Sequence, residues 1–575
     1  MLTKLSIRNF KRFGSVEIEL GNPVVFIGPN NSGKTTALQA LALWDIGLRR
    51  WNERRSGKST PEKRPGVTIN RRDLIAVPVA DANLLWRDLH VRDVRRTNGK
   101  QQTQNIRVDI TVEGVTEGAA WVCGFEFDYA NEESFYCRPL RISKTERMLV
   151  PHQAAKTRVA FLPPMSGLAA NENRLDAGAV HVRLGEGRTA EVLRNLCYQV
   201  VRELGEPAWN KLQGRIRELF GVTLEEPVYV AERGEITMLY LTPSGVRLDL
   251  SSAGRGLQQT LLLLAHLAVN PGSVLLLDEP DAHLEILRQR QIYQLLAEAA
   301  REQKSQIIAA SHSEVLLNEA ADRDVVVAFV GKPHRIDDQS SQVLKSLKEI
   351  GFDQYYQAEE TGWILYLEGS TDLAILRAFA EILNHPAGPL LERPFVHYTY
   401  NQPLKARDHF YGLREAKGDL VGIAIFDRLD QKLQDRLELK EHMWKRREIE
   451  NYLCCPEALS AWAKEEGGQK LGPLFAPGWQ EQMTQAVGEI ETAMATLGKG
   501  SPWSPDTKVS DDFLDPLFVA FFKRLSLPNL MRKSDYHVLA RHVPADRIDP
   551  EITQVLEGVV EVSARANPAR EEDGA

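Results

Sequence analysis

The run GPNNSGKTT, from Gly28 to Thr36, carries the residue types that bind nucleotide phosphates. It follows an apolar, β-branched run and precedes a helix-forming segment, which is the strand–loop–helix context of a P-loop. Its glycines let the backbone turn tightly, so that successive amides point at phosphate oxygens, and the helix N-terminus adds its positive end. Lys34 is placed to reach the β- and γ-phosphates, and Thr35 to hold Mg²⁺. The sequence therefore predicts an ATP site formed by Asn30, Asn31, Ser32, Gly33, Lys34, Thr35 and Thr36.

Further residues suited to phosphate chemistry follow at the ends of apolar runs. VLLLDEP places Asp278 and Glu279 at the end of a predicted strand. There Asp278 would join the Mg²⁺ shell, and Glu279 would polarise the attacking water as general base. QIIAASHS ends another predicted strand at His312. The Ser- and Gly-rich turn LSSAGRG (250–256) precedes both of these strands in the sequence. It leads into a long apolar helix that begins near Gly254.

The order of these motifs resembles that of the ATP-binding-cassette class of ATPases. The resemblance implies that His312 is the switch histidine that senses the γ-phosphate. It also implies that Ser251 or Ser252, with Gly254, contacts the γ-phosphate of a nucleotide held by the opposite subunit, so that the protein forms at least a homodimer. LSSAGRG departs from the LSGGQ of that class, and no glutamine stands in the context of its Q-loop.

A second group of acids follows in a second predicted α/β unit. Glu368 ends the apolar run WILYL, and Asp372 lies in the first turn of the next helix, where acids are common for structural reasons alone. GIAIFDRLD places Asp427 and Asp430 at the end of another strand. Carboxylates at the carboxyl ends of parallel strands suit Mg²⁺ or Mn²⁺, which would activate water and stabilise a phosphoryl transition state.

Residues 363–455 resemble a TOPRIM domain, whose pattern is a Glu on the first strand and Asp-x-Asp on a later one. Here Leu429 stands at the second Asp position, and the acid comes one residue later, at Asp430. The segment KRREIENYL (445–453) is similar to one that follows the acids in OLD-type (overcoming lysogenization defect) nucleases. The resemblance implies that Glu450 or Glu448 completes the metal site, and that Lys445, Arg446 and Arg447 contact DNA phosphates.

Strands that alternate with helices predict an α/β fold with a mainly parallel sheet. We expect an ATP-binding-cassette ATPase domain over 1–335, a linker over 336–360, a TOPRIM-like domain over 361–460 and a mostly helical region with a disordered tail over 461–575. Within the first domain, residues 49–100 hold 14 Lys or Arg and 6 Asp or Glu. They form either a solvated insertion or a phosphate-facing surface. Residues 187–220 predict two helices that project as an arm.

The composition indicates an ordinary globular protein without a membrane segment, because no run of about 18 apolar residues occurs. The N-terminal residues alternate in polarity and do not read as a signal peptide. Five scattered cysteines, without a CxxC pair, favour a reducing, cytoplasmic setting and buried thiols. The formal net charge of −7 means that DNA binding would depend on local basic patches.

The opening SIRNFKRF (6–13) and the variant EPDAHL (279–284) are similar to the soluble DNA-maintenance branch: RecF- and SMC-like heads and OLD-family nucleases. This resemblance implies an ATP-gated, metal-dependent DNA endonuclease in bacterial anti-phage defence or DNA maintenance. Two alternatives stay open. One is an ATP-dependent DNA clamp whose TOPRIM-like unit is inactive, which Leu429 would explain. The other is an ATPase scaffold for a separate effector protein.

Overall fold

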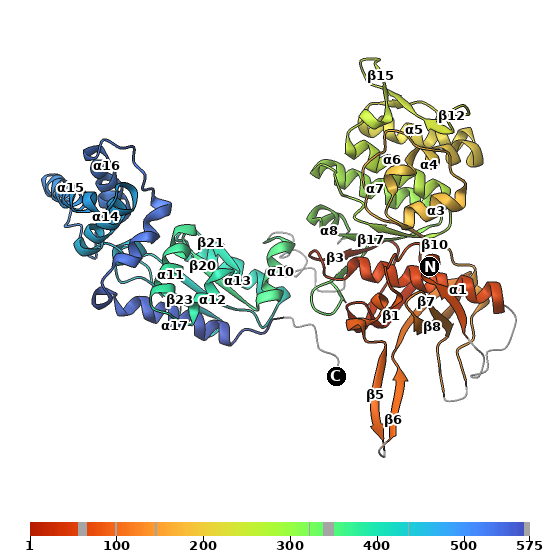
Figure 1. Ribbon diagram of the computed structural model, residues 1–575, viewed down its shortest axis with the longest axis horizontal. Helices are drawn as coiled ribbons and strands as arrows, with labels where there is room; N and C mark the ends of the chain where they lie inside the picture. Colours follow the sequence, from red (N-terminus) through yellow and green to blue (C-terminus); the bar gives the residue numbers. More distant parts are fainter. Residues whose placement is uncertain are drawn as a thin grey trace. The chain divides into compact units, whose positions relative to one another are not determined.

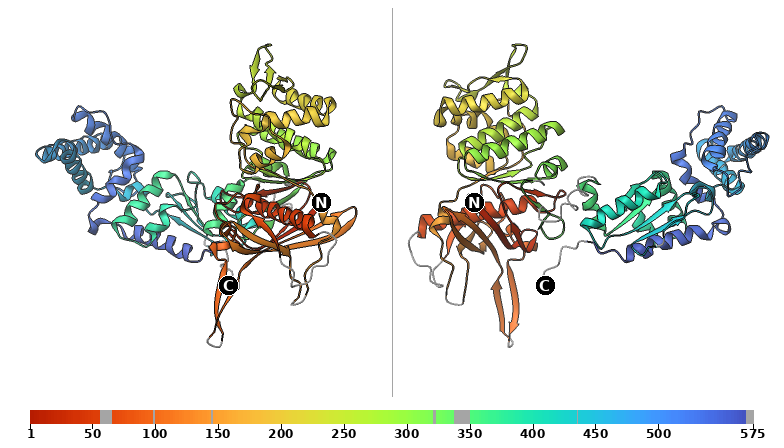
Figure 2. Two further views of the ribbon diagram at one scale, coloured as in Figure 1. Left: turned by 45° about the vertical axis from the view of Figure 1, so that its right-hand side comes forward. Right: turned by 180° about the vertical axis from the view of Figure 1, so that it is seen from behind.

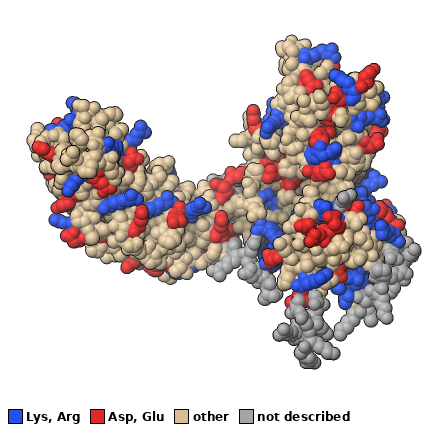
Figure 3. All heavy atoms as spheres, viewed as in Figure 1, with Lys and Arg blue, Asp and Glu red and all other residues tan. Residues whose placement is uncertain are grey.

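The computed structural model describes residues 1–55, 66–97, 100–143, 146–320, 323–336, 350–434 and 436–568. The chain forms two compact units, unit 1 up to residue 344 and unit 2 from residue 345 to residue 570. Both are α/β units with their own sheets (Figure 1 and Figure 2). In the view of Figure 3, Lys and Arg are interspersed with Asp and Glu over both units.

Unit 1 contains an antiparallel sheet that packs against helix α1 (Lys34–Arg55). In spatial order, its strands are β2 (Phe13–Glu19), β1 (Leu2–Phe10), β7 (Arg107–Thr116), β8 (Ala119–Asn131), β9 (Ser134–Pro139) and β4 (Val67–Asn70). Buried residues alternate with more exposed ones along β7, as in a sheet with one covered face. The predicted antiparallel pairing of the first two strands is confirmed, with Leu5 opposite Ile18.

A second, mainly parallel sheet in unit 1 positions the nucleotide motifs. Its strands, in spatial order, are β10 (Val159–Leu162), β16 (Val274–Asp278), β17 (Gln306–Ser311), β3 (Val24–Ile27), β18 (Val325–Ala328) and the antiparallel β19 (His334–Arg335). Every residue of β3, β16 and β17 is buried, which explains why their sequences are continuous apolar runs. The predicted parallel α/β sheet is confirmed. Its carboxyl edge carries the P-loop, Asp278 and His312.

The helices of residues 187–220 do not project as an arm. They are α4 (Leu193–Gln199), which continues into the π-helical turn η5 (Val200–Leu204), and α5 (Glu206–Phe220). Gly205, at φ +80°, separates them. Trp209, Leu212 and Ile216 are buried in one core with the apolar residues of α6 (Arg255–Val269). The helices that the spacing predicts are present, but their apolar residues pack in the core of unit 1, together with residues of α7 (Ile286–Glu302).

The predicted basic insertion is also largely part of the fold. Helix α1 continues to Arg55, and β4 pairs with β9. Trp86 is buried and donates from its indole Nε1 to Ile106 O at 2.8 Å. The hairpin β5 (Arg92–Thr97) and β6 (Lys100–Asn105) follows. Residues 56–65 and 98–99 lie outside the described residues, and a phosphate-facing role for this basic segment stays a prediction.

Unit 2 is built on a four-stranded parallel sheet. Its strands, in spatial order, are β21 (Val396–Tyr398), β20 (Trp363–Leu367), β22 (Val421–Phe426) and β23 (Leu439–Met443). The helices between them are α11 (Ser370–Ile382), α12 (Ala387–Glu392) and α13 (Pro403–Ala416). The segment expected to be a linker includes helix α10 (Phe352–Thr361). Residues 337–349 of that linker lie outside the described residues.

The C-terminal residues are mostly helical but do not form a separate appendage. They comprise α14 (Pro456–Leu471), α15 (Ala476–Thr496), α16 (Asp515–Arg524), the 3₁₀ segment η10 (Lys533–His542) and α17 (Pro550–Ala564). The apolar stripe of α17, including Ile552, Val555 and Val559, shares one core with the sheet and with α11. Gly558 lies so close to β22 that an added Cβ would stand 3.2 Å from Ile423 Cδ1. The chain therefore returns to cover its own sheet.

Candidate functional site

The P-loop has the geometry of a phosphate cradle. Lys34 Nζ donates to the carbonyl oxygens of Gly28 and Pro29, at 2.6 and 2.7 Å. Among the described residues, the buried hydroxyl of Ser32 has no hydrogen-bond partner. A buried hydroxyl without a partner is costly, and a phosphate oxygen would supply one. The residues of the loop therefore fit a nucleoside triphosphate.

The turn between β1 and β2 reaches the P-loop, which the sequence analysis missed. Gly33 has φ +103°, and a Cβ there would lie 2.7 Å from Phe13 Cζ and 2.9 Å from Arg12 Cδ. In the same turn, Lys11 donates to Gln39 of α1 at 2.6 Å, and burial lowers the pKa of Lys11 to about 8. The motif KRF at 11–13 was visible in the sequence, but its approach to Gly33 depends on the packing of two separate segments.

Thr35 and Asp278 meet at the carboxyl edge of the sheet. Thr35 Oγ1 donates to the Asp278 carboxylate, at 3.1 Å from Oδ1 and 2.9 Å from Oδ2. Burial raises the pKa of Asp278 to about 6, and the charge of Glu279 adds to this, while the Thr35 hydrogen bond opposes it. A hydroxyl beside a carboxylate is a donor set suited to Mg²⁺. These two residues would hold the ion beside the β- and γ-phosphates.

Glu279 and His312 lie near each other at the same edge. Glu279 adopts φ +49°, uncommon for a side chain of this size, while its amide donates to Ala310 O at 2.8 Å. His312 Nδ1 is 3.8 Å from Glu279 Oε1, and both side chains are partly exposed. Strained backbone of this kind is concentrated at functional sites. The structure thus brings together the P-loop, Asp278 and the pair predicted to act on water and the γ-phosphate.

The turn at 250–254 is held by Asp249 and Arg194. Asp249 Oδ1 accepts from Ser251 N at 2.8 Å, from Ser251 Oγ at 2.6 Å and from the buried Arg194 at 2.9 Å. Ser252 Oγ donates to Asp249 O at 2.6 Å. Gly254 then precedes helix α6. A cleft of about 560 Å³ opens at Gly254 and His283. Ser251, Ser252 and Gly254 are exposed.

Four carboxyl side chains of unit 2 gather at the carboxyl edge of its sheet. Asp372 Oδ2 accepts from the amide of Glu368 at 3.1 Å. Burial, then the hydrogen bond with Glu368 and the charges of Glu368, Asp372 and Glu450, raise the pKa of Asp427 far above its ordinary value. Burial and the charge of Glu368 raise the pKa of Asp372 to about 6. Burial and the charges of Glu448 and Asp372 raise the pKa of Glu450 to about 8. The mutual effects show that Glu368, Asp372, Asp427 and Glu450 share one region.

Two other acids of this region have different partners. Glu448 is buried and accepts from Ser510 N at 2.5 Å and Ser510 Oγ at 3.0 Å, so its carboxylate anchors the segment before α16. Asp430 is exposed in the loop after β22. Asp372 has the expected helix-start position, because its carboxylate accepts from the Glu368 amide just before α11. The charge of Glu368 also contributes to the raised pKa of Asp372.

Two lysines beside the carboxylates come from the C-terminal region. Burial would lower the pKa of Lys533, but the charges of Glu450 and Asp511 raise it. A hydrogen bond with Asp511 raises the pKa of Lys508, and Glu448 and Glu368 contribute. Both lysines therefore lie within electrostatic range of the cluster. The sequence gave no sign of this, because they are some 60 to 80 positions downstream of Glu450.

The three basic side chains before Glu448 lie in different environments. Arg446 lies over the ring of Tyr452, with Cζ 5.0 Å from its centroid, and donates to Asn451 O at 3.2 Å. Lys445 and Arg447 are exposed. Arg446 is thus engaged in packing, and the other two are available to a ligand. Cys454 is buried, Cys455 is half-buried, and both are free thiols.

The described residues lack a preformed metal cluster and a membrane-spanning helix. Within them, no three His, Cys, Asp or Glu side chains are arranged tightly enough to hold a metal ion. The carboxylates of unit 2 have the oxygen chemistry of a Mg²⁺ or Mn²⁺ site, but some must move closer together to bind one. Over the same ranges, no helix combines the length and apolarity that a membrane span requires.

Comparison with known proteins identifies the nucleotide-binding unit. The model of an AAA ATPase domain matches residues 1–44, and one described as "AAA domain, putative AbiEii toxin, Type IV TA system" matches residues 206–318. The two matches contain the P-loop and Asp278, Glu279 and His312. Unit 1 therefore carries an ATPase domain of the AAA type. No curated protein sequence matches this chain.

Solved structures give weaker similarities. An SMC head domain from Thermotoga maritima is 16% identical, with 58% of this chain and 98% of that one covered and a TM-score of 0.30. An Smc head from Pyrococcus furiosus, with an extended coiled coil and bound to the C-terminal domain of ScpA, is 15% identical, with 61% and 99% covered and a TM-score of 0.33. An SmcHead bound to the C-winged helix domain of ScpA is 14% identical, with 58% and 97% covered and a TM-score of 0.35.

Proposed function

We propose that the protein is an ATP-hydrolysing, divalent-metal-dependent DNA endonuclease of the OLD type, acting in bacterial anti-phage defence or DNA maintenance. Unit 1 binds and hydrolyses ATP, and unit 2 is a TOPRIM-like nuclease. The observation that carries the nuclease proposal is the gathering of Glu368, Asp372, Asp427 and Glu450 at one strand edge. Acids placed so that they raise one another's pKa are typical of functional sites.

A divalent cation fits this cluster chemically. Burial and the neighbouring carboxyl group of Glu368 raise the pKa of Asp427, so the site favours a proton or a cation between these acids. A Mg²⁺ or Mn²⁺ ion could replace that proton, with Glu368, Asp372 and Asp427 as its oxygen ligands. Such an ion supplies an activated water and neutralises charge on a phosphodiester. Lys533, and the exposed Lys445 and Arg447, would hold DNA phosphates near the acids.

In unit 1, the chain's own residues suit ATP hydrolysis between two copies. Lys34 binds the phosphates, Thr35 and Asp278 hold Mg²⁺, and Glu279 orients the attacking water. The exposed Ser252 and Gly254 are available to the nucleotide of a second copy. We therefore propose a homodimer, or a higher homo-oligomer, that forms through the ATPase units.

A plasmid-cleavage assay tests the nuclease proposal. Wild-type protein with ATP and Mn²⁺ should nick supercoiled DNA. Glu368→Ala should reduce nicking by at least about 100-fold and leave ATP turnover unchanged. Asp430→Asn is the matched control, because this acid lies outside the cluster, and it should retain nicking. Nicking by Glu368→Ala at the wild-type rate would contradict the site.

A second function is favoured by two observations. Leu429 stands where the TOPRIM pattern has an acid, and no three described side chains are yet arranged around a metal position. Both suit an ATP-dependent DNA clamp or scaffold, with an inactive second unit, that regulates a partner effector protein. It predicts ATP turnover and DNA binding by the wild type, with no cleavage in either Mg²⁺ or Mn²⁺.

A further inference from the structure

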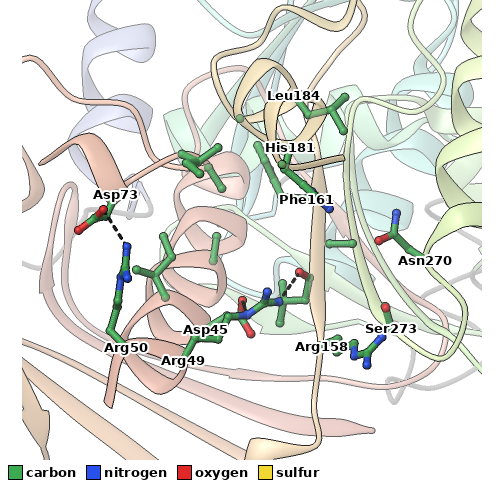
Figure 4. Close-up of a pocket in the computed structure, with 18 of the residues that line it drawn as sticks. Asp45, Arg49, Arg50, Asp73, Arg158, Phe161, His181, Leu184, Asn270 and Ser273 are labelled. Carbon is green, nitrogen blue, oxygen red and sulfur yellow. Dashed lines mark hydrogen bonds and ion pairs between the residues drawn. The ribbon is translucent and has the colours of Figure 1, made fainter. Parts of the chain in front are cut away.

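A cleft of about 620 Å³ opens in unit 1 at the edge of the parallel sheet opposite the P-loop (Figure 4). Its walls are the C-terminal half of α1, the start of β10, helix α3 (Ala177–Gly185) and the loop after α6. Arg49 lies fifteen residues beyond Lys34 on α1, which corresponds to about 22 Å along the helix. The cleft is thus separate from the ATP site.

One cation is fixed at the wall of this cleft. Arg49 Nε lies 2.7 Å from Asp45 Oδ2, and Arg49 also donates to Val159 O at 3.4 Å. The Asp45 side chain is 8% exposed, whereas that of Arg49 is 55% exposed. A buried carboxylate therefore orients a guanidinium whose outer face stays open to solvent. Such an orientation lowers the entropy cost of binding an anion.

Arg158 and His181 also line the cleft. Arg158 is exposed just before β10, and it forms no ion pair with a carboxylate of the described residues. His181 lines the cleft from α3, where burial and the nearby charge of Arg49 lower its pKa. Arg50, by contrast, is paired with Asp73 at 2.8 Å and with Glu53 at 3.1 Å. Arg49 is also paired, with Asp45, but its side chain is 55% exposed and its outer face can still meet a ligand, as can the exposed Arg158.

The rest of the wall is largely apolar. Ile75, Phe161 and Leu184 line it, and Figure 4 shows Phe161, His181 and Leu184 on the same side of the cleft. A volume of this size, with apolar walls and a few placed polar groups, is typical of small-ligand sites. We propose that the cleft binds a phosphate-bearing ligand of mononucleotide size. Its phosphate lies on Arg49 and Arg158, and its ring lies against Phe161 and Leu184.

Calorimetric titration of the full-length chain tests this proposal. The protein carries Lys34→Ala, which silences the P-loop, and the probes are 5′-AMP, GMP, CMP and UMP. We expect saturable binding of at least one of them, and binding at least about tenfold weaker for its nucleoside, because the charged hydrogen bonds are lost. Arg49→Gln and Arg158→Gln should each weaken binding about tenfold or more. Arg54→Gln is the matched control, since Arg54 is exposed on α1 outside the cleft, and it should change affinity by less than about twofold.

A steric variant keeps the test valid if the charge variants fold poorly. Gly178 lines the cleft, and a Cβ there would have no atom within 4 Å. Gly178→Phe should therefore fill the cleft without disturbing the fold, which thermal unfolding would check, and should abolish binding. The proposal is overturned if none of the four nucleotides binds below about 1 mM. It is equally overturned if binding survives Gly178→Phe, or if Arg49→Gln binds as well as Arg54→Gln.

Discussion

Replacing Asp249 should disable ATP turnover from a position that does not touch the P-loop nucleotide. Its carboxylate caps the turn that precedes α6, where it accepts both hydrogen bonds from Ser251 and one from Arg194. Asp249→Ala removes all three bonds. Asp249→Asn keeps an acceptor oxygen for Ser251 and loses only the charge. The pair of variants therefore separates the geometry of the turn from its electrostatics.

The size of the effect follows from these contacts. Loss of a capping side chain costs about 0.5–2 kcal/mol, and a hydrogen bond to a charged group contributes about 1.5–3 kcal/mol. Since the Asp249 side chain is 39% exposed, solvent screening favours the lower ends of both ranges, about 2–3 kcal/mol together. That corresponds to a loss of about 30- to 150-fold in the population of the ordered turn. Asp249→Asn should cost about 1 kcal/mol.

The assay compares steady-state ATP turnover with nucleotide affinity. Asp249→Ala should reduce turnover at saturating ATP by at least about tenfold, Asp249→Asn should be intermediate, and ATP affinity should stay within about twofold. Burial opposes ionisation of Asp249, but the Ser251 hydrogen bonds and Arg194 lower its pKa overall. Its stabilisation is therefore complete above about pH 4, and the ranking should hold from pH 6 to pH 9. Wild-type turnover by Asp249→Ala would refute the role of residues 250–254 in hydrolysis.

Three further changes test the ATP site. Lys34→Ala should abolish ATP binding, measured by filter binding, and unchanged affinity would disprove the P-loop prediction. Glu279→Gln should bind ATP and hydrolyse it at least about 100-fold more slowly, so normal turnover in a phosphate-release assay would remove Glu279 as the base. Gly33→Ala forces a Cβ to within 3 Å of Phe13 and Arg12 at φ +103°. It should weaken ATP binding at least about tenfold, whereas Gly178→Ala, in open space, should bind ATP normally.

Much of the nucleotide site was predictable because its signals are local. In Gly28–Thr35, the turn residues, the lysine and the threonine all lie within one loop, between a buried strand and a helix. Asp278 was predictable for a similar reason, since it ends a strand that is otherwise continuously apolar. Such features depend only on residues that are close together in the sequence. The approach of Phe13 to Gly33 depends on how two separate segments pack, and the sequence analysis did not predict it.

For the acidic residues of unit 2, the neighbouring sequence was not enough to predict which of them form the site. Glu448 and Glu450 are two residues apart, and the sequence treated them as alternatives. Their environments differ because Glu448 accepts hydrogen bonds from Ser510, whereas burial and the charges of Glu448 and Asp372 raise the pKa of Glu450. Asp430 is exposed in the loop after β22. Which carboxylate joins the cluster is decided by segments that are distant in sequence.

The C-terminal helices therefore belong to the candidate nuclease site and not to a separate region. Glu551, at the start of α17, accepts hydrogen bonds from the Tyr452 hydroxyl and, at 3.1 Å, from Lys445 N. These bonds fix both ends of the segment that carries Glu450. Lys508 and Lys533 offset the repulsion among carboxylates that burial would otherwise make costly. A unit ending near residue 460 would lack these lysines and the apolar cover of α17. The smallest part of unit 2 that can form this cluster thus extends through Ala564.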